Sequence, residues 1–267
     1  MKPLIDMHSH IAWGIDDGMP SMDDAVKSLI QAKNDGIGII LSTPHCVPGQ
    51  TDEEGINAMY ARQKELWILA KQYGIKVYPG AEVFMNDFFT ESLDNGWYRT
   101  INGTKYLLVE YDVTNDIHTF SDRDEWLYEV RIRDMIPVLA HAERYFHKGV
   151  DWDIVNQWRN DGTVIQMNRT SLMGYHGDLI KKNAVELLHA GMIDMVVTDT
   201  HRSFKPRWEM LSDAYQWIET DMGEETADLL FRGNPAAVLK GEAVTHPSGK
   251  AGKETWLERT KKLISLR

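Results

Sequence analysis

Two histidines and three aspartates crowd into the fourteen residues IDMHSHIAWGIDDG at positions 5–18. Imidazole and carboxylate groups bind either protons or metal ions, so this segment is a candidate for metal ligation. His8 and His10 stand two residues apart, which puts both side chains on one face of an extended segment. Asp199 and His201 repeat that spacing. Each pair could therefore bind one ion.

The same residue types recur where most of the apolar runs that we interpret as strands end. They are His8 and His10 after the first run, His45 in STPHC after the second, Glu82, Glu110 and His141 at the ends of the third to fifth, and Asp199 with His201 after the seventh. In a βα barrel the C-terminal strand ends meet at one mouth, so these side chains would converge. A lone loop histidine is usually structural, and only the joint pattern favours ligation.

The two adjacent aspartates and the remaining histidines could have structural roles instead of binding metal. Asp16 and Asp17 precede Gly18 and would by default form a solvated turn, but the flanking histidines make at least one of them a candidate, and we include Asp17. The remaining histidines do not follow strand ends in this way and are interpreted as structural: His118, His147, His176, His189 and His246.

The candidate ligands number nine, which is more than one zinc ion needs. A cluster of ions suits them better, and imidazole with carboxylate donors and no thiolate fits Zn, Mn or Fe. Three divalent ions would bring +6 against the −4 of Asp17, Glu82, Glu110 and Asp199. An acidic protein would then contain a cationic pocket.

Strand-like and helical segments alternate along the chain. We predict strands near 3–7, 37–43, 75–82, 105–110, 136–141, 163–168 and 193–198, with helices between them. Ser21, Thr51 and Ser121, each followed three residues later by an acidic residue, predict helix starts, and Gly36, Gly74 and Gly191 predict helix ends. Seven or eight such units in series favour a closed or nearly closed α/β barrel of parallel strands.

Composition limits the class of protein. The 267 residues are 43% hydrophobic and 26% charged, as expected for a globular protein, and the formal net charge of −11 disfavours nucleic-acid binding. No apolar run is long enough for a membrane helix, no signal peptide is evident, and the single Cys46 fits a reducing cytoplasm. We expect one domain over 1–246. In the tail 247–267, Trp256, Leu257, Leu263 and Ile264 suggest a peripheral helix.

Six motifs together resemble the PHP (polymerase and histidinol phosphatase) superfamily: DMHSHIAWGIDDG, STPH, GAE, VEY, AHAERY and TDTH. They look closest to its metal-dependent protein-tyrosine phosphatases of bacterial capsule and exopolysaccharide synthesis. The resemblance covers residues 1 to about 240, and the ordered series is far more specific than any one fragment. It implies a distorted TIM-like (β/α)7 barrel with a trinuclear metal site.

The resemblance also implies how the ligands divide among three ions, with manganese among the candidate metals. One ion would be held by His8, His10, Glu82 and Asp199, a second by Glu82, Glu110 and His141, and the third by Asp17, His45 and His201. Many superfamily members have a histidine where Glu110 stands, whereas the tyrosine-phosphatase branch resembles this chain in using a carboxylate. Arg144 matches a phosphate-binding arginine of the family. A second arginine could be Arg202 or Arg207, and we choose Arg207.

The implied reaction is hydrolysis of phosphotyrosine by a metal-activated hydroxide without a covalent intermediate. Thiol phosphatases use a Cys-x5-Arg loop, but Asp52 stands six positions after Cys46. The alternatives are a histidinol-phosphate or other small-molecule phosphatase, an amidohydrolase, which usually has a bridging lysine where Glu110 stands, and a noncatalytic phosphotyrosine binder. The implied partner is the C-terminal tail of a bacterial tyrosine kinase. Trp13 or Tyr145 could stack on the tyrosine ring, although a core position is the commoner role of such residues.

Overall fold

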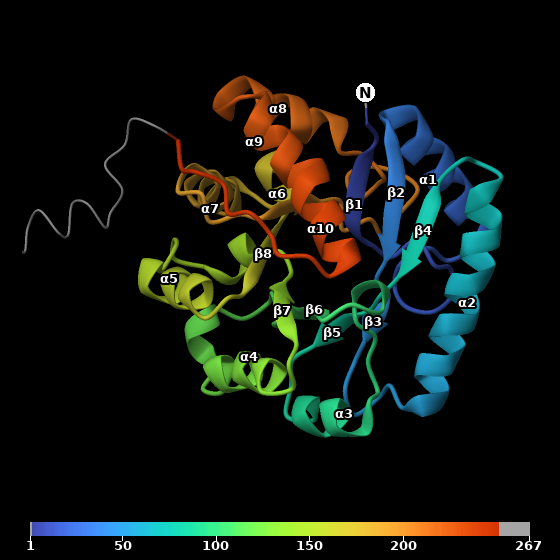
Figure 1. The fold of residues 1–267 in the computed structure, drawn as a ribbon, viewed down its shortest axis with the longest axis horizontal. Helices are drawn as coiled ribbons and strands as arrows, with labels where there is room; N and C mark the ends of the chain where they lie inside the picture. The colour runs from blue at the N-terminus through green and yellow to red at the C-terminus, as the bar shows by residue number, and fades with distance from the viewer. Residues whose placement is uncertain (1, 251–267) are drawn as a thin grey trace, which may run out of the picture.

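Parallel strands occupy the centre of the molecule and helices surround them in the computed structural model, which describes residues 2–250 (Figure 1). The strands are β1 (Leu4–Ser9), β2 (Ile37–Ser42), β3 (His45–Cys46), β4 (Lys76–Pro79), β5 (Glu82–Phe84), β6 (Tyr106–Glu110), β7 (Ile136–Leu139), β8 (Val164–Asn168) and β9 (Met195–Val197). Every pairing between them is parallel. The predicted α/β class is confirmed.

Two strands of the sheet are each divided in two: the predicted strand 37–43 matches the first half of one, β2, whereas the predicted bounds 75–82 were wrong because they span the break in the other. The run 37–43 ends at Ser42 and pairing resumes in β3, while the run 75–82 is interrupted at Gly80 and Ala81 between β4 and β5. Pro44 and Pro79 lack the N–H that a regular ladder needs, which favours a break at these points. The Gly80 N–H donates to the Ser42 carbonyl at 2.9 Å, so the two divided strands stay paired across the break.

The strands form two hydrogen-bonded sheets, ordered β1-β2-β4 and β3-β5-β6-β7-β8-β9. The two divided strands join the sheets on one side. On the other side β9 meets β1 through a single bridge between Ser9 and Thr200, with the Asp199 N–H donating to the His8 carbonyl at 2.9 Å. The ring therefore has seven strand positions and one irregular seam, which is the distorted (β/α)7 barrel that was predicted.

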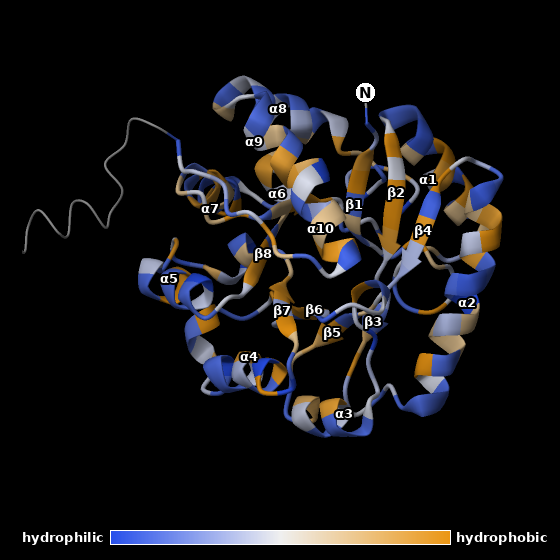
Figure 2. Ribbon diagram, viewed as in Figure 1, coloured by the Kyte–Doolittle hydropathy of each residue, from blue (hydrophilic) through white to orange (hydrophobic). Residues whose placement is uncertain are grey.

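Helices cover the outside of the ring. They are α1 (Met22–Asp35), α2 (Glu53–Lys71), α3 (Phe89–Asn95), α4 (Arg123–Arg131), α5 (Trp152–Asn160), α6 (Arg169–Leu172), α7 (Asp178–His189), α8 (Ser212–Met222), α9 (Glu224–Asp228) and α10 (Asn234–Lys240), with short 3-10 turns η1 (Ile101–Gly103), η2 (Ile117–Thr119) and η3 (Ala142–Tyr145) and a π-turn η4 (Leu229–Gly233). The strands are mostly hydrophobic, whereas the helices mix both kinds of residue, as amphipathic outer elements should (Figure 2).

A buried apolar cluster fills the barrel and leads to the mouth. It includes Leu108 and Val197, and Val238 and Leu239 of α10 belong to the same cluster. Leu108 is two residues before Glu110, and Val197 is two residues before Asp199. Because side chains two apart on a strand share a face, the strands that build the core also direct their last polar side chains into the mouth.

The N-cap residues of three helices can be compared with the helix starts that were predicted. Ser21 is the N-cap of α1 and its hydroxyl accepts from the Asp24 N–H at 3.2 Å, as predicted. For the next two helices the predicted cap residue was wrong by one position: Asp52 caps α2, and Asp122 precedes α4 without a side-chain cap bond. Gly36 ends α1 at a φ of 87°, where glycine is favoured.

The C-terminal prediction falls mostly outside the described residues. Residues 247–250 are described and are not helical, and the predicted helix in the tail otherwise lies beyond Lys250. Among residues 2–250, no helix combines the length and apolar character needed to cross a membrane.

Candidate metal centre

The nine predicted ligand side chains meet at the mouth of the barrel. His8 is the last residue but one of β1 and His10 follows the strand, Asp17 lies in the next loop, His45 is in β3, Glu82 begins β5, Glu110 ends β6, His141 follows β7, and Asp199 and His201 follow β9. Seven of these residues are buried, whereas His45 is half-buried and the Asp17 side chain is 64% exposed. The structure thus assembles the predicted set around one opening.

His8 and His10 converge with Glu82 and Asp199. The Nε2 atoms of both histidines lie 3.2 Å from Glu82 Oε2 and 3.7 Å from Asp199 Oδ1. Donors that share one ion at about 2.1 Å in a tetrahedral arrangement lie about 3.4 Å apart. The spacing of these four side chains therefore fits a single ion.

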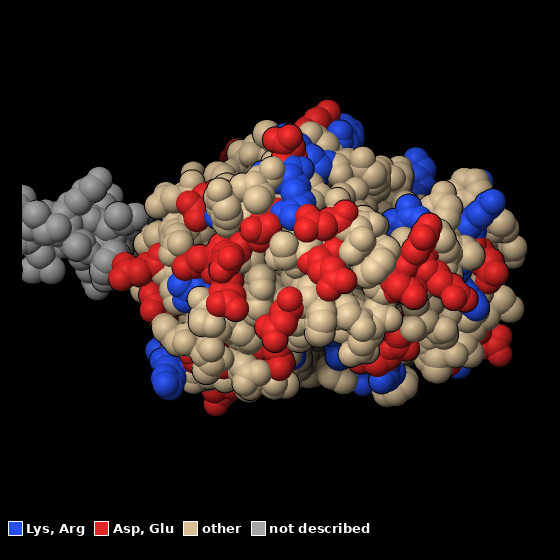
Figure 3. Space-filling view, turned by 90° about the horizontal axis from the view of Figure 1, so that it is seen from below, with Lys and Arg blue, Asp and Glu red and all other residues tan. Residues whose placement is uncertain are grey.

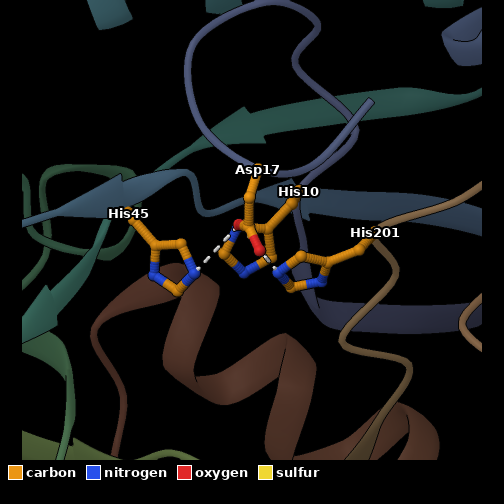
Figure 4. Close-up of side chains that lie close together, drawn as sticks. All are labelled: His10, Asp17, His45 and His201. Atoms are coloured by element: carbon orange, nitrogen blue, oxygen red, sulfur yellow. Dashed lines mark ion pairs between the residues drawn. The ribbon is translucent and has the colours of Figure 1, made fainter. Parts of the chain in front are cut away.

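Two further groups adjoin the first. His141 Nε2 lies 3.1 Å from Glu82 Oε1 and 3.5 Å from Glu110 Oε2. On the other side, Asp17 Oδ1 lies 3.4 Å from the Nε2 atoms of both His45 and His201 (Figure 4). These are the groupings expected for a second and a third ion.

His45 joins the groups together. Its Nδ1 lies 3.2 Å from Glu82 and 3.1 Å from Glu110, while its Nε2 faces Asp17. Its ring therefore connects the Asp17 group to the two glutamates. The donor set, which contains imidazoles and carboxylates and no thiolate, fits Mn, Fe or Zn.

The adjacent aspartates have different contacts, which sequence could not resolve. Asp16 turns inward: its Oδ2 accepts from His10 Nδ1 at 2.7 Å and from the His45 N–H at 2.9 Å. Since a carboxylate only accepts, His10 must be protonated on Nδ1, which leaves the lone pair of Nε2 facing the cluster. Gly18 lets the loop close, because a Cβ there would lie 2.3 Å from the His10 carbonyl oxygen.

Arg202 and Arg207, the two candidates for the second phosphate contact, make different contacts. Arg207 Nη2 donates to Asp199 Oδ1 at 2.9 Å and lies 3.1 Å from His201 Nε2. Arg202 instead donates to backbone carbonyls, those of Asp17, Gly18 and His201. Arg144 lies on the other side of the same carboxylate, with Nη1 3.8 Å from Asp199 Oδ2. Arg144 and Arg207 thus stand beside the cluster and Arg202 supports a loop.

Charge interactions within the cluster are strong. Burial would raise the pKa of Glu82, but the charge of His8 and hydrogen bonds from His10, His141 and His45 hold it well below its usual range. Burial would lower the pKa of His141, yet its bonds to Glu110 and Glu82 raise it to about 9. The carboxylates thus stabilise positive charge in the mouth, which a proton or a metal ion can supply.

The backbone supports the same conclusion. Among the described residues, His141 and Asp199 are two of the few non-glycine residues with a positive φ, at 32° and 52°. Such conformations cost of order 1–3 kcal/mol and concentrate at functional sites. Both side chains belong to the predicted ligand set.

Sequence reasoning missed three residues near the cluster. Gln166 and Asn168 of β8 contact His8 and Asp199, and two amides spaced i, i+2 in an apolar strand were the signal that could have found them. His176, interpreted as structural, contacts Thr170 Oγ1 at 3.0 Å, and burial together with the nearby charge of Arg144 lowers its pKa to about 4. No sequence pattern distinguished it.

Three other residues have structural surroundings. Tyr145 is fully buried and its hydroxyl accepts from the Tyr111 N–H, so it is a core residue. Trp13 is half-buried with the Arg62 guanidinium 4.8 Å from its ring. Cys46 is buried, and burial raises the pKa of its thiol to about 12, which disfavours the thiolate that a nucleophile needs.

A sequence model described as "Capsular polysaccharide synthesis, CpsB/CapC" matches residues 4–240. The tyrosine-protein phosphatase CpsB of Streptococcus agalactiae serotype III is 28% identical over 251 residues, covering 90% of this chain and all of the relative. The tyrosine-protein phosphatase YwqE of Bacillus subtilis is 26% identical over 242 residues, covering 90% and 93% of the two chains. The putative tyrosine-protein phosphatase CapC of Staphylococcus aureus is 28% identical over 200 residues, covering 74% and 77%.

Solved structures of other proteins share the fold of this chain. The similar structures include one from a study of YwqE from Bacillus subtilis and CpsB from Streptococcus pneumoniae, described as unique metal-dependent tyrosine phosphatases. It superposes with a TM-score of 0.82 at 24% identity, covering 94% of this chain and all of that one. A dihydropyrimidinase from Brevibacillus agri shares only the fold, with a TM-score of 0.53 at 10% identity over 94% of this chain and 74% of the enzyme. With the family model spanning the whole barrel, this chain belongs to the CpsB/CapC family of capsular polysaccharide synthesis.

Proposed function

We propose that this protein is a metal-dependent protein-tyrosine phosphatase, a phosphoric monoester hydrolase. One observation supports it above the others: Arg144 and Arg207 contact opposite oxygens of Asp199, at the edge of a buried cluster of imidazoles and carboxylates. A phosphoryl group needs both cationic hydrogen-bond donors and an activated water, and this mouth offers residues for both. The names of the curated relatives support the same reaction.

The proposed centre would hold three divalent ions. His8, His10, Glu82 and Asp199 would hold the first, Glu82, Glu110 and His141 the second, and Asp17, His45 and His201 the third, in keeping with the short distances within each set. Ions bound there would lower the pKa of a water nucleophile and offset the charge of the phosphoryl oxygens. Manganese, iron and zinc all suit the donors.

The chain's own residues would orient the substrate. The guanidinium of Arg207 can turn from Asp199 to a phosphoryl oxygen while keeping its planar, multiply donating geometry. Arg144 would contact the phosphoryl group from the other side. Together they would hold the phosphorus in line with the attacking water, without a covalent intermediate on the protein.

We further propose that the substrate is a phosphotyrosine protein of the bacterial cytoplasm, the C-terminal tail of a tyrosine kinase that regulates capsule or exopolysaccharide assembly. The family description and the relatives' names support this assignment. The face in Figure 3 carries many acidic side chains among fewer basic ones, in keeping with the net charge of −11 and with a partner other than nucleic acid.

The test compares substrates on one metal-loaded preparation. Phosphotyrosine peptides and histidinol phosphate are assayed with Mn, Zn, Co and Fe, before and after chelation. We expect metal-dependent turnover and a higher kcat/KM for the peptides. Faster turnover of histidinol phosphate would overturn the substrate assignment, and inactivity toward every phosphomonoester with every metal would overturn the enzyme assignment.

A further inference from the structure

Strand β8 contributes two buried amides to the mouth and no predicted ligand. Gln166 and Asn168 are fully buried and stand two residues apart, so they share the face of the strand that points inward. A buried amide costs free energy unless it is hydrogen-bonded, so its partners indicate its role. Each of these amides contacts a different predicted ligand of the first ion.

Gln166 determines which nitrogen of His8 carries a proton. The Gln166 Nε2 donates to the Met7 carbonyl at 3.3 Å, and a carbonyl can only accept, so the amide oxygen must face the other way. That oxygen lies 3.3 Å from His8 Nδ1, which therefore donates to it. In its neutral, metal-binding form the His8 ring then has its lone pair on Nε2, the atom that faces Glu82 and Asp199.

Asn168 forms a hydrogen bond with only one of the two carboxylate oxygens of Asp199. Its Nδ2 donates to Asp199 Oδ2 at 2.7 Å, and the opposite orientation of the amide would set oxygen against oxygen. Asp199 Oδ1 remains directed at His8 and His10 and accepts from Arg207. Oδ1 is thus the oxygen that faces the other predicted ligands of the first ion, and Oδ2 is the one that Asn168 holds.

The position of Asn168 is itself fixed by a buried contact. Its backbone N–H donates to Glu143 Oε1 at 3.1 Å. Its side-chain Oδ1 has no hydrogen-bond partner within the described residues, and an unsatisfied buried acceptor costs about 1–3 kcal/mol. An apolar residue would avoid that cost, which indicates that this amide serves Asp199 rather than the stability of the core.

We propose that Gln166 and Asn168 are positioning residues that set the tautomer of His8 and the orientation of Asp199 for the first ion. Both are neutral, so they orient the two ligands without adding charge to the mouth. Partners of this kind typically change metal affinity 10–100-fold when removed. The inference rests on the proposed metal centre.

The first experiment measures binding rather than turnover. Mn²⁺ and Zn²⁺ are titrated calorimetrically into metal-free wild type, Gln166→Met and Asn168→Leu, and urea unfolding is measured on the same samples. Asn234→Leu is the matched control, because Asn234 is also buried but donates only to the Asp194 and Thr245 carbonyls, away from the mouth. We expect about 10–100-fold weaker binding of one ion in the two β8 variants and wild-type affinity in the control.

The second experiment observes the tautomer directly. Imidazole ¹⁵N shifts of the metal-free protein at alkaline pH should place the His8 proton on Nδ1 in the wild type. Gln166→Met should lose this preference, whereas Gln166→Glu, which keeps an acceptor, should retain it and bind metal more tightly than Gln166→Met. Asn168→Ser replaces Asn168→Leu if the latter does not fold.

The outcomes separate the inference from the proposed function. Wild-type affinity in both β8 variants, or an equal loss in Asn234→Leu, would overturn the positioning roles while leaving the phosphatase assignment intact. A wild type that binds no metal would overturn the metal centre. In that case the Asn168 role fails with it, and an Nε2 proton on His8 would overturn the role of Gln166 as well.

Discussion

At the scale of single residues, the mouth of the barrel assigns different contacts to chemically identical neighbours. Asp16 is directed inward and accepts from His10 and two backbone N–H groups, whereas Asp17 is mostly exposed and faces His45 and His201. Burial would raise the pKa of Asp16, but the hydrogen bond from His10 and those backbone donors lower it. Asp16 therefore acts as an anionic orienting group and Asp17 as a candidate ligand.

The pair Asp16→Asn and Asp17→Asn tests this division. Asp17→Asn removes a charged donor from the third group, so elemental analysis should find about one ion fewer per chain. Asp16→Asn should keep the ion count but weaken binding about 10–100-fold, because His10 loses its anionic acceptor. The same reduced ion count in both variants would contradict the assignment.

Arg207 and Arg202 are separated in the same way. Arg207→Ala should lower kcat/KM for a phosphotyrosine peptide about 10²–10³-fold, the usual effect of losing one donor to a developing anion. Arg202→Ala removes only contacts to carbonyls and should change kcat/KM much less. Steady-state kinetics at fixed metal loading measures both, and a larger effect of Arg202→Ala would show that the wrong arginine was chosen.

At the scale of elements, helix caps and the seam of the barrel hold the mouth together. Ser21, the N-cap of α1, comes shortly after the loop that contains Asp16, Asp17 and Gly18 in the sequence. At the seam, the buried carboxylate of Asp6 on β1 accepts from the Thr198 N–H and hydroxyl at 2.9 and 2.6 Å. These contacts position the loops and strand ends from which the ligands project.

The two serines predicted as caps make a matched stability test. Ser21→Ala should lower the free energy of unfolding by about 1 kcal/mol, because the Asp24 N–H loses its acceptor. Within residues 2–250, Ser121 caps no helix and its hydroxyl bonds only to Asp122, so Ser121→Ala should stay within about 0.5 kcal/mol of wild type. Urea unfolding of both variants measures these changes. Equal losses of unfolding free energy would contradict the capping role of Ser21.

The seam predicts a pH-dependent stability. Burial raises the pKa of Asp6 from 3.8 to about 6, so the protonated form favours folding below pH 3.8 and this contribution is lost as the pH rises to 6. Asp6→Asn is isosteric and cannot ionise. Relative to wild type it should gain about 2–3 kcal/mol in free energy of unfolding between pH 4 and 7, measured by urea unfolding. A difference that does not vary with pH would refute this.

At the scale of the whole molecule, a net charge of −11 coexists with a mouth that is built to hold cations. Burial would lower the pKa of His201, but Asp199 and Asp17 raise it to about 9, as Glu110 and Glu82 do for His141. In the metal-free protein these rings therefore hold protons at neutral pH. Bound ions must displace those protons, because only neutral imidazole ligates a metal.

Metal affinity should consequently rise with pH. Each displaced proton adds about a tenfold gain per pH unit, levelling off above pH 9. Calorimetry in buffers of different ionisation enthalpy should detect proton release at pH 7. Chelation should also lower the melting temperature, because ions bind only the folded chain. Affinity that is independent of pH between 6 and 9 would contradict this account.

The sequence by itself determined the α/β class, the order of the elements and the nine candidate ligands, which the structure brings to one mouth. These follow from local rules, since strand periodicity and the position of a polar residue at a strand end are both written in short segments. The ordered series His8, His45, Glu82, Glu110, His141 and Asp199 needed only the assumption that C-terminal strand ends meet.

Only the tertiary structure shows how two similar neighbours differ in their contacts. The contacts of Asp17 and Asp16, and those of Arg207 and Arg202, depend on the path of a loop and on side-chain rotamers, which no periodicity encodes. The breaks after Ser42 and Pro79 and the contacts of Gln166 and Asn168 likewise depend on strands distant in sequence. Such contacts form only when the barrel closes, so local sequence patterns could not predict them.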